Sequence, residues 1–257
     1  MTQKYKLACR LIFRFFNMFV GLENALILQE HLKKYFTIGV SIDCVVFGFD
    51  GSDLKVLLIE RGEMPYKDFW ALPGDLMAPD EDLNASVNRI LKDLTGLKGL
   101  FFEQVETFGE VDRHPLGRVL TTGYYTLVKI SDYKLNPSSF AAEAKWFRIQ
   151  DVGTLAFDHN KILDSCFNRL KASVRTRPIG FELLPPEFTM TELQTLYEAI
   201  LGIKLDVRNF RKKILQMKFL QETGNMQDNV SHRPAKLYAF NEGKYNALKN
   251  RGFNFEV

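Results

Sequence analysis

A short stretch near the C-terminus concentrates side chains that could bind nucleic acid. The predicted helix over 207–218 has apolar residues at helical spacing, at 207, 210, 214 and 217, which would dock it on a core. Its other face is basic, and Arg and Asn can hydrogen-bond phosphates and base edges. The residues expected to contact DNA are Arg208, Asn209, Arg211, Lys212 and Lys213 on the helix, with Arg233 and Lys236 on a following ribbon. A solvated basic helix face is the alternative.

A second helix raises the question of metal chemistry. Mg²⁺ needs oxygen ligands, and carboxylates at positions i, i+3 and i+4 share one helical face. In the predicted helix over 80–96 such positions hold Ile90, Asp93 and Leu94. Ile90 and Leu94 offer no ligand and extend an apolar stripe instead. We therefore expect no catalytic residue, no metal and no cofactor.

Polar side chains at strand ends and in loops of the central region could line a binding cavity. Asp, Glu, Arg and Tyr recognise the hydroxyls of a sugar, whereas an ADP-ribose-like metabolite also needs cations for its diphosphate and a surface for adenine. The candidates are Arg61, Glu103, Asp112, Arg113, Arg118 and Tyr124. Each could instead be a surface or core residue. His114 and His159 are expected to be structural, and His232 falls in the ribbon turn.

The elements that must position these residues are strand-rich up to about residue 150. Strands are predicted at 37–49, 53–61, 69–75, 101–109, 118–130 and 144–149, and helices at 80–96 and 160–173. The order β-β-β-α-β-β-β-α predicts a mixed sheet sandwiched by helices, within an α+β chain.

The pattern changes beyond Pro178. Thr189 and Glu192 form a capping-box signature for a helix that Gly202 ends, and Asp206 can cap the basic helix after a short turn. Strands at 219–223 and 236–240 follow. Helix, turn, helix and ribbon is the order of a winged helix-turn-helix. The predicted domains are 35–176 and 177–257, preceded by an extension over 1–34 that could reflect a start assigned upstream of the true one.

The overall charge conceals this division. The 257 residues carry a net charge of +3. The stretch 203–251 alone holds eleven basic and four acidic residues, so it is +7 and the remainder is −4. Three widely spaced cysteines fit neither a disulfide framework nor a CxxC metal site, which favours a reducing cytoplasm. The apolar run over 7–20 is too short and too charged to span a bilayer.

Residues 37–150 resemble the Nudix domain. Gly74 opens a Nudix box that, with one extra residue, continues at Glu81, Arg89, Leu91, Gly96 and Leu97. The three glutamates of the family's helix correspond to Ile90, Asp93 and Leu94. The resemblance therefore implies a Nudix fold without its catalytic carboxylates.

With the basic C-terminal module, the chain resembles the Nudix-related transcriptional regulators, and in particular their arabinose-responsive repressors. The resemblance rests on IDCVVFGF, LKVLLIER, FGEVDRHPLGRVLTTGYY and RPIGFELLPPEFTMTELQTLYEAI. It implies a homodimer that binds operator DNA under control of a small molecule, such as arabinose or an ADP-ribose-like metabolite, and represses sugar-utilisation genes. His114 and Leu116 replace an acid and a base of the family's RDPRG tract. The alternatives are a Nudix hydrolase of ADP-ribose and a protein-binding module.

Overall fold

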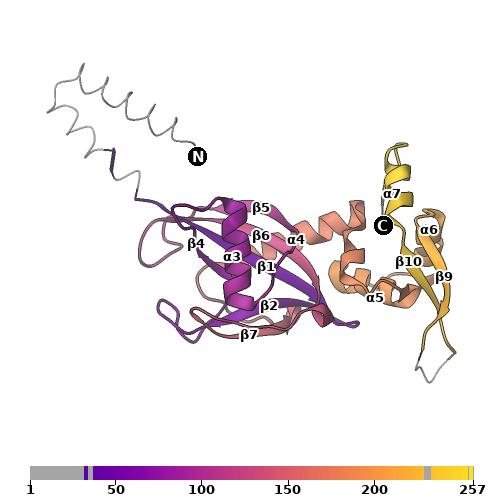
Figure 1. Ribbon diagram of the computed structural model, residues 1–257, viewed down its shortest axis with the longest axis horizontal. Coiled ribbons are helices and arrows are strands. Elements are labelled where there is room, and N and C mark those ends of the chain that lie inside the picture. Colours follow the sequence, from indigo (N-terminus) through magenta and orange to yellow (C-terminus); the bar gives the residue numbers. More distant parts are fainter. Residues whose placement is uncertain (1–31, 34–36, 229–232, 254, 257) are drawn as a thin grey trace, which may run out of the picture.

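The computed structural model describes residues 32–33, 37–228, 233–253 and 255–256 (Figure 1). The extension expected over 1–34 lies outside the described residues except for 32–33, and so does His232. Among the described helices, none combines the length and the apolar content that crossing a bilayer requires.

A mixed, seven-stranded sheet forms the larger domain. Its main order is β3-β2-β1-β6-β5, with β4 also pairing with β1 and β7 with β2. Strands β1 and β6 run parallel along their whole length, and the other pairs are antiparallel. The strands are β1 (Gly39–Phe49), β2 (Leu54–Arg61), β3 (Trp70–Ala71), β4 (Gly74–Leu76), β5 (Phe102–Phe108), β6 (Val119–Lys129) and β7 (Ala141–Arg148).

Two helices cover opposite faces of this sheet, α3 (Leu83–Thr95) and α4 (His159–Thr176). The central strand β1 is buried on both sides because its side chains alternate between them. Ile42, Cys44 and Val46 pack in the cluster that contains α3, whereas Val45 and Phe47 pack in the cluster that contains α4. The expected helix–sheet–helix sandwich with a mixed sheet is confirmed.

The C-terminal part contains α5 (Met190–Leu201), α6 (Val207–Gln216) and a small sheet of order β8-β10-β9. Its strands are β8 (Phe188–Thr189), β9 (Leu220–Met226) and β10 (Lys236–Phe240). The capping box at Thr189 and Glu192 is present, and Gly202 ends α5 in the left-handed conformation. This is the predicted winged helix, with β9 and β10 as the wing ribbon (Figure 1).

The boundary expected after residue 176 falls at the end of α4, but one apolar cluster continues across it. Phe47 and Leu170 of the larger domain belong to the same cluster as Leu196, Tyr197 and Phe210 of the winged helix. Three short 3-10 helices complete the connections: η2 (Ile130–Asp132), η3 (Ile149–Asp151) and η4 (Pro178–Leu183), the last joining α4 to the winged helix.

The structure departs from the predicted elements in several places, including the unpredicted β8 and the start of β7 at Ala141. The helix expected from residue 80 begins at Leu83, because Asp82 caps it by accepting from Ala85 N. The strand expected at 69–75 is split into β3 and β4, which pair with different partners. A further helix, α7 (Glu242–Lys249), capped by Asn241, was not predicted.

Candidate functional site

A cavity of about 240 Å³ opens beside the first residues of β1, between the sheet and the start of α4. We call it the β1–α4 cavity. It is lined by Ser41, Asp43, Arg61, Glu63, Pro65, Gly74, Asp75, Leu76, Arg113, His114, Leu116, Val119, Phe140, Phe157 and His159. Two arginines, three carboxylates, two histidines and two phenyl rings therefore converge on one concave surface.

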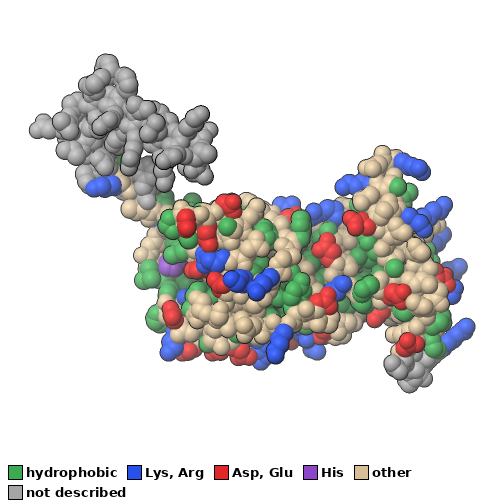
Figure 2. Space-filling view, viewed as in Figure 1, with side chains coloured by type: hydrophobic (Ala, Val, Ile, Leu, Met, Phe, Trp, Pro, Cys, Tyr) green, Lys and Arg blue, Asp and Glu red, His purple; other side chains and the backbone are tan. Residues whose placement is uncertain are grey.

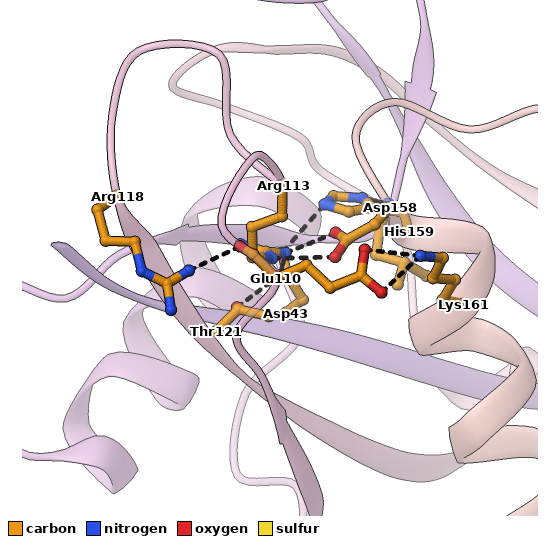
Figure 3. Close-up of polar contacts among 9 residues, drawn as sticks. Asp43, Glu110, Arg113, Arg118, Thr121, Asp158, His159 and Lys161 are labelled. Atoms are coloured by element: carbon orange, nitrogen blue, oxygen red, sulfur yellow. Dashed lines mark hydrogen bonds and ion pairs between the residues drawn. The ribbon is translucent and has the colours of Figure 1, made fainter. Parts of the chain in front are cut away.

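A buried network of polar side chains forms the floor of the cavity (Figure 3). Arg113 donates from Nε and Nη2 to both carboxylate oxygens of Asp158, at 3.0 and 2.7 Å. Arg113 Nη2 also lies 3.5 Å from Asp43 Oδ2, which accepts a 2.6 Å hydrogen bond from Thr121 Oγ1. The pairing of β1 with β6 brings Thr121 to Asp43, and Gly74 leaves room for that carboxylate, since a Cβ there would collide with Asp43 Oδ1.

His159 lies beside this network. Burial lowers its pKa, although the nearby Asp43 and Asp158 act in the opposite direction. Its Nδ1 accepts from the backbone N–H of Leu72 at 2.9 Å, so the proton of the neutral ring is on Nε2. That atom lies 3.4 Å from Asp43 Oδ1. The buried imidazole of His159 thus lies against the Asp43 carboxylate at the floor of the cavity.

Aromatic rings surround the second arginine of the cavity. The Arg61 guanidinium lies 5.0 Å from the centre of the Phe140 ring and 5.1 Å from that of Phe157, and Nε donates to Pro65 O. His114 stacks on Phe157 with 5.2 Å between ring centres and 12° between planes. Burial and the neighbouring Arg113 and Arg61 lower the pKa of His114. This wall offers a cation and flat rings side by side.

Two residues of the cavity region have backbone conformations that side chains rarely adopt. Phe157 has φ = 53° and Tyr66 has φ = 60°, and their rings are 4.6 Å apart. Such conformations cost about 1–3 kcal/mol each and persist where the surroundings enforce them, often at binding sites. Phe157 immediately precedes α4, so one of these two conformations lies at the start of that helix.

The structure brings two of the six predicted effector residues into this cavity, Arg61 and Arg113. Asp112 is exposed, and Arg118 donates to the backbone oxygen of Glu110. Glu103 pairs with Arg177 at 2.8 Å, and Tyr124 is a core residue whose hydroxyl donates to Gln104. Contact between these six side chains and an effector stays a prediction.

Sequence reasoning missed the partners that hold Arg113. Asp43 lies inside an apolar strand, where an acid is itself a signal, because carboxylates are rarely buried unless paired. Asp158 is 45 residues from Arg113 in sequence, and only the fold brings the two side chains into direct contact. Likewise, only the fold brings His159 next to Asp43. His114, expected to be a turn residue, also lines the cavity.

Helix α3, which carries most of the Nudix-box positions, packs an apolar face into the core. Ile90 and Leu94 are at most 2% exposed, in the cluster that contains β1 and β2. Glu81 is held by Arg89 at 2.7 Å and by Ser86, and chiefly the bond from Arg89 lowers its pKa to about 2. Within the described residues, no group of three or more His, Cys, Asp or Glu side chains is arranged to hold a metal ion.

The second helix of the winged helix presents the predicted basic face. Phe210 and Ile214 are buried and fix α6 on the core, and Asp206 caps its start by accepting from Asn209 N. All five predicted side chains are exposed: Arg208, Asn209, Arg211, Lys212 and Lys213. Figure 2 shows Lys and Arg side chains along the edge that carries α6, α7 and the wing.

The two predicted wing residues are exposed as well. Arg233 precedes β10 in the chain, and Lys236 pairs with Glu222 across β9 and β10 at 2.6 Å. The geometry of α6 and the wing suits phosphate contacts on either side of a groove. Contact with DNA by each of the seven residues remains a prediction.

Comparisons with known proteins match both domains. Residues 37–167 match the NUDIX domain, and residues 180–240 match the NrtR DNA-binding winged helix domain. The chain is 33% identical to the ADPR responsive transcriptional repressor NtrR of Acinetobacter baylyi over 91% of this chain and 92% of that protein. It is 31% identical to an ADP-ribose pyrophosphatase of Methanocaldococcus jannaschii, over 54% of this chain and 80% of the other.

Solved structures agree. Shewanella oneidensis NrtR is 30% identical with a TM-score of 0.67, over 78% of this chain and 93% of that one. The same protein complexed with a 27mer DNA is 28% identical with a TM-score of 0.66, over 84% and 97%. The chain therefore belongs to the NrtR family, in which a Nudix domain is joined to a DNA-binding winged helix domain.

Proposed function

We propose that this chain is a transcriptional repressor that binds operator DNA through its winged helix and responds to ADP-ribose bound in the β1–α4 cavity. The Acinetobacter relative is named as an ADPR-responsive repressor, and the Shewanella relative was crystallised with DNA. Arabinose and sugar-utilisation genes, expected from the sequence resemblance, find no support in these relatives. We therefore propose ADP-ribose as the effector in their place.

The observation that carries the proposal is the combination of cations and aromatic rings in the cavity. A diphosphate needs positive charge, which Arg61 supplies directly and Arg113 supplies once it leaves its ion pair with Asp158. Adenine needs a flat surface, which His114 and Phe157 supply. A volume of 240 Å³ is below the roughly 300–1,000 Å³ of pockets that enclose whole drug-sized ligands. One end of ADP-ribose would thus extend beyond the cavity, past the exposed Leu116 of its lining.

The DNA-binding role is assigned to α6 and the wing. Because operators of winged helix regulators usually have two-fold symmetry, we propose a homodimer that presents two α6 helices to two half-sites. Effector binding would then alter operator affinity by changing how the two winged helices are placed, and only by as much as ADP-ribose prefers one placement.

A fluorescence anisotropy titration tests the proposal. Full-length protein is titrated against DNA from its own gene neighbourhood, with ADP-ribose, arabinose or no addition. We expect specific binding that ADP-ribose changes and arabinose does not. Absence of specific binding under all three conditions contradicts the proposal.

Substitution of a cavity arginine tests whether ADP-ribose binds in the β1–α4 cavity. Arg61→Met removes a cation from the cavity, and we expect a loss of ADP-ribose affinity of about tenfold or more, since hydrogen bonds to charged groups contribute about 1.5–3 kcal/mol. Arg148→Met is the matched control, because the Arg148 guanidinium pairs with Asp53 at 3.1 Å and does not line the cavity. Calorimetry that finds equal losses in both variants contradicts the placement.

The second candidate is a Nudix hydrolase of ADP-ribose, which the Methanocaldococcus relative favours. Against it stand Ile90 and Leu94, which are buried apolar side chains. By the resemblance to the Nudix box, these two positions correspond to carboxylates of the family's helix. We propose that the chain has no such activity. Turnover of ADP-ribose with Mg²⁺ or Mn²⁺ that Asp93→Asn abolishes would establish the hydrolase instead.

A further inference from the structure

Three consecutive residues at the start of α4 connect it to the β1–α4 cavity. Phe157 and His159 line the cavity directly. Asp158, between them, binds Arg113, which lines the cavity from the opposite side with its side chain only 3% exposed. A ligand that contacts this wall therefore contacts the first residues of α4 or their immediate partner.

The same helix reaches the winged helix domain. The 18 residues of α4 extend about 27 Å at 1.5 Å per residue. Its buried face, from Ile162 to Val174, belongs to the apolar cluster that also contains α5 and α6. Its C-terminal neighbour Arg177 pairs with Glu103 and leads into η4 and then into the winged helix. A packed helix moves as a rigid body, so a shift at one end is passed to the other.

Asp158 occupies the position that normally caps a helix, yet its carboxylate caps nothing. It is the N-cap residue of α4 and makes no side-chain capping hydrogen bond, because both oxygens accept from Arg113. An N-cap aspartate ordinarily accepts from the second or third backbone N–H of the helix. The carboxylate thus has two alternative partners, the Arg113 guanidinium and the start of α4.

We propose that Asp158 is the positioning residue that couples the cavity to the winged helix, by exchanging its ion pair with Arg113 for a cap on α4 when an anionic effector binds Arg113. The inference rests on the proposed function, because it requires the diphosphate of ADP-ribose at the guanidinium. The freed carboxylate accepts from the N–H of Asn160, the second residue of α4, and draws the start of the helix into a new position. Two discrete hydrogen-bonding arrangements supply the two states that coupling needs.

Asp158→Asn isolates this role in the full-length protein. Asparagine cannot form the ion pair but caps a helix as well as aspartate does. We expect operator affinity in the effector-free variant to match that of the native protein saturated with ADP-ribose. Added ADP-ribose then changes the operator affinity of the variant less than about threefold, whereas an allosteric effector typically changes the affinity for a second ligand by about 5–150-fold. ADP-ribose itself binds more tightly, since Arg113 no longer has to leave its ion pair with the Asp158 carboxylate.

Lys161→Met is the matched control. Lys161 pairs with Glu110 at 2.7 Å, which joins the same loop to the same helix turn at an exposed position outside the cavity lining (Figure 3). This variant is expected to retain the native coupling. Full coupling in Asp158→Asn, or equal loss in both variants, overturns the inference.

Two further measurements distinguish failure of this inference from failure of the proposed function and from misfolding of a variant. Native protein that binds operator DNA but not ADP-ribose in calorimetry refutes the proposed function, and the inference with it. Hydrogen exchange on the native protein needs no variant: ADP-ribose should slow exchange at the Asn160 amide, which gains an acceptor. An unchanged rate at that amide, in protein shown to bind ADP-ribose, overturns the inference alone.

Discussion

The hydroxyl of Tyr197 is fully buried in the core shared by the two domains, and it has no hydrogen-bond partner among the described residues. Burial raises the pKa of this phenol far above its usual range. Tyr197→Phe removes one oxygen and no hydrogen bond. Because a buried unsatisfied polar group costs about 1–3 kcal/mol, we expect the variant to be more stable by about 1 kcal/mol, and its Tm to rise by about 2–4 °C.

Tyr125→Phe provides the opposite case within the same core. The Tyr125 hydroxyl donates to Glu103 at 3.2 Å and accepts from Arg177 at 3.4 Å. Its removal should lower the free energy of unfolding by about 1 kcal/mol. Urea unfolding followed by circular dichroism measures both, with a changed midpoint at constant m value as the criterion. If Tyr197→Phe lowers the midpoint, the hydroxyl is satisfied in solution and the reasoning is refuted.

Three other predictions concern helix α3, the two buried cysteines and the basic face of α6. Leu94→Glu should destabilise the fold by about 3 kcal/mol or more in thermal unfolding and give no Mg²⁺-dependent turnover, because it buries an unpaired carboxylate; an active, stable variant would contradict this. Burial raises the pKa of Cys166 to about 12 and that of Cys44 well above its usual value, so iodoacetamide at pH 8 should leave both thiols unmodified in the native protein and alkylate both in urea, as mass spectrometry can test. Arg208→Ala and Lys212→Ala should each reduce the slope of log K against log salt concentration by about 1; an unchanged slope would show that the residue does not contact a phosphate.

Helices and strands could be predicted where a short sequence pattern defines them. The capping box at Thr189 and the apolar spacing of α6 each lie within about ten residues, and both appear as expected. Helix α7 was missed because none of its residues is buried and its apolar pattern is weak. The strand over 69–75 was predicted whole, since the sequence does not show that β3 and β4 pair with different neighbours.

The candidate site was less accessible to sequence reasoning because it depends on distant pairings. Arg113 was singled out by residue type, but Asp158 and Asp43 reach it only through the parallel pairing of β1 with β6 and the packing of α4. Glu103 was chosen on the same grounds as Arg113, and the fold places it beside Arg177 instead. Residue type identifies groups capable of binding, and the topology decides which of them meet.

The apolar cluster that runs from the sheet into the winged helix also bears on how such a regulator diversifies. A module joined by a flexible linker can be exchanged by recombination, whereas here Phe181, Leu196 and Tyr197 are packed into the same interior as Phe47 and Leu170. Cutting between them would expose apolar surface on both halves. Substitutions at the cavity wall or on the exposed face of α6 leave this shared interior intact, whereas exchange of one whole domain does not.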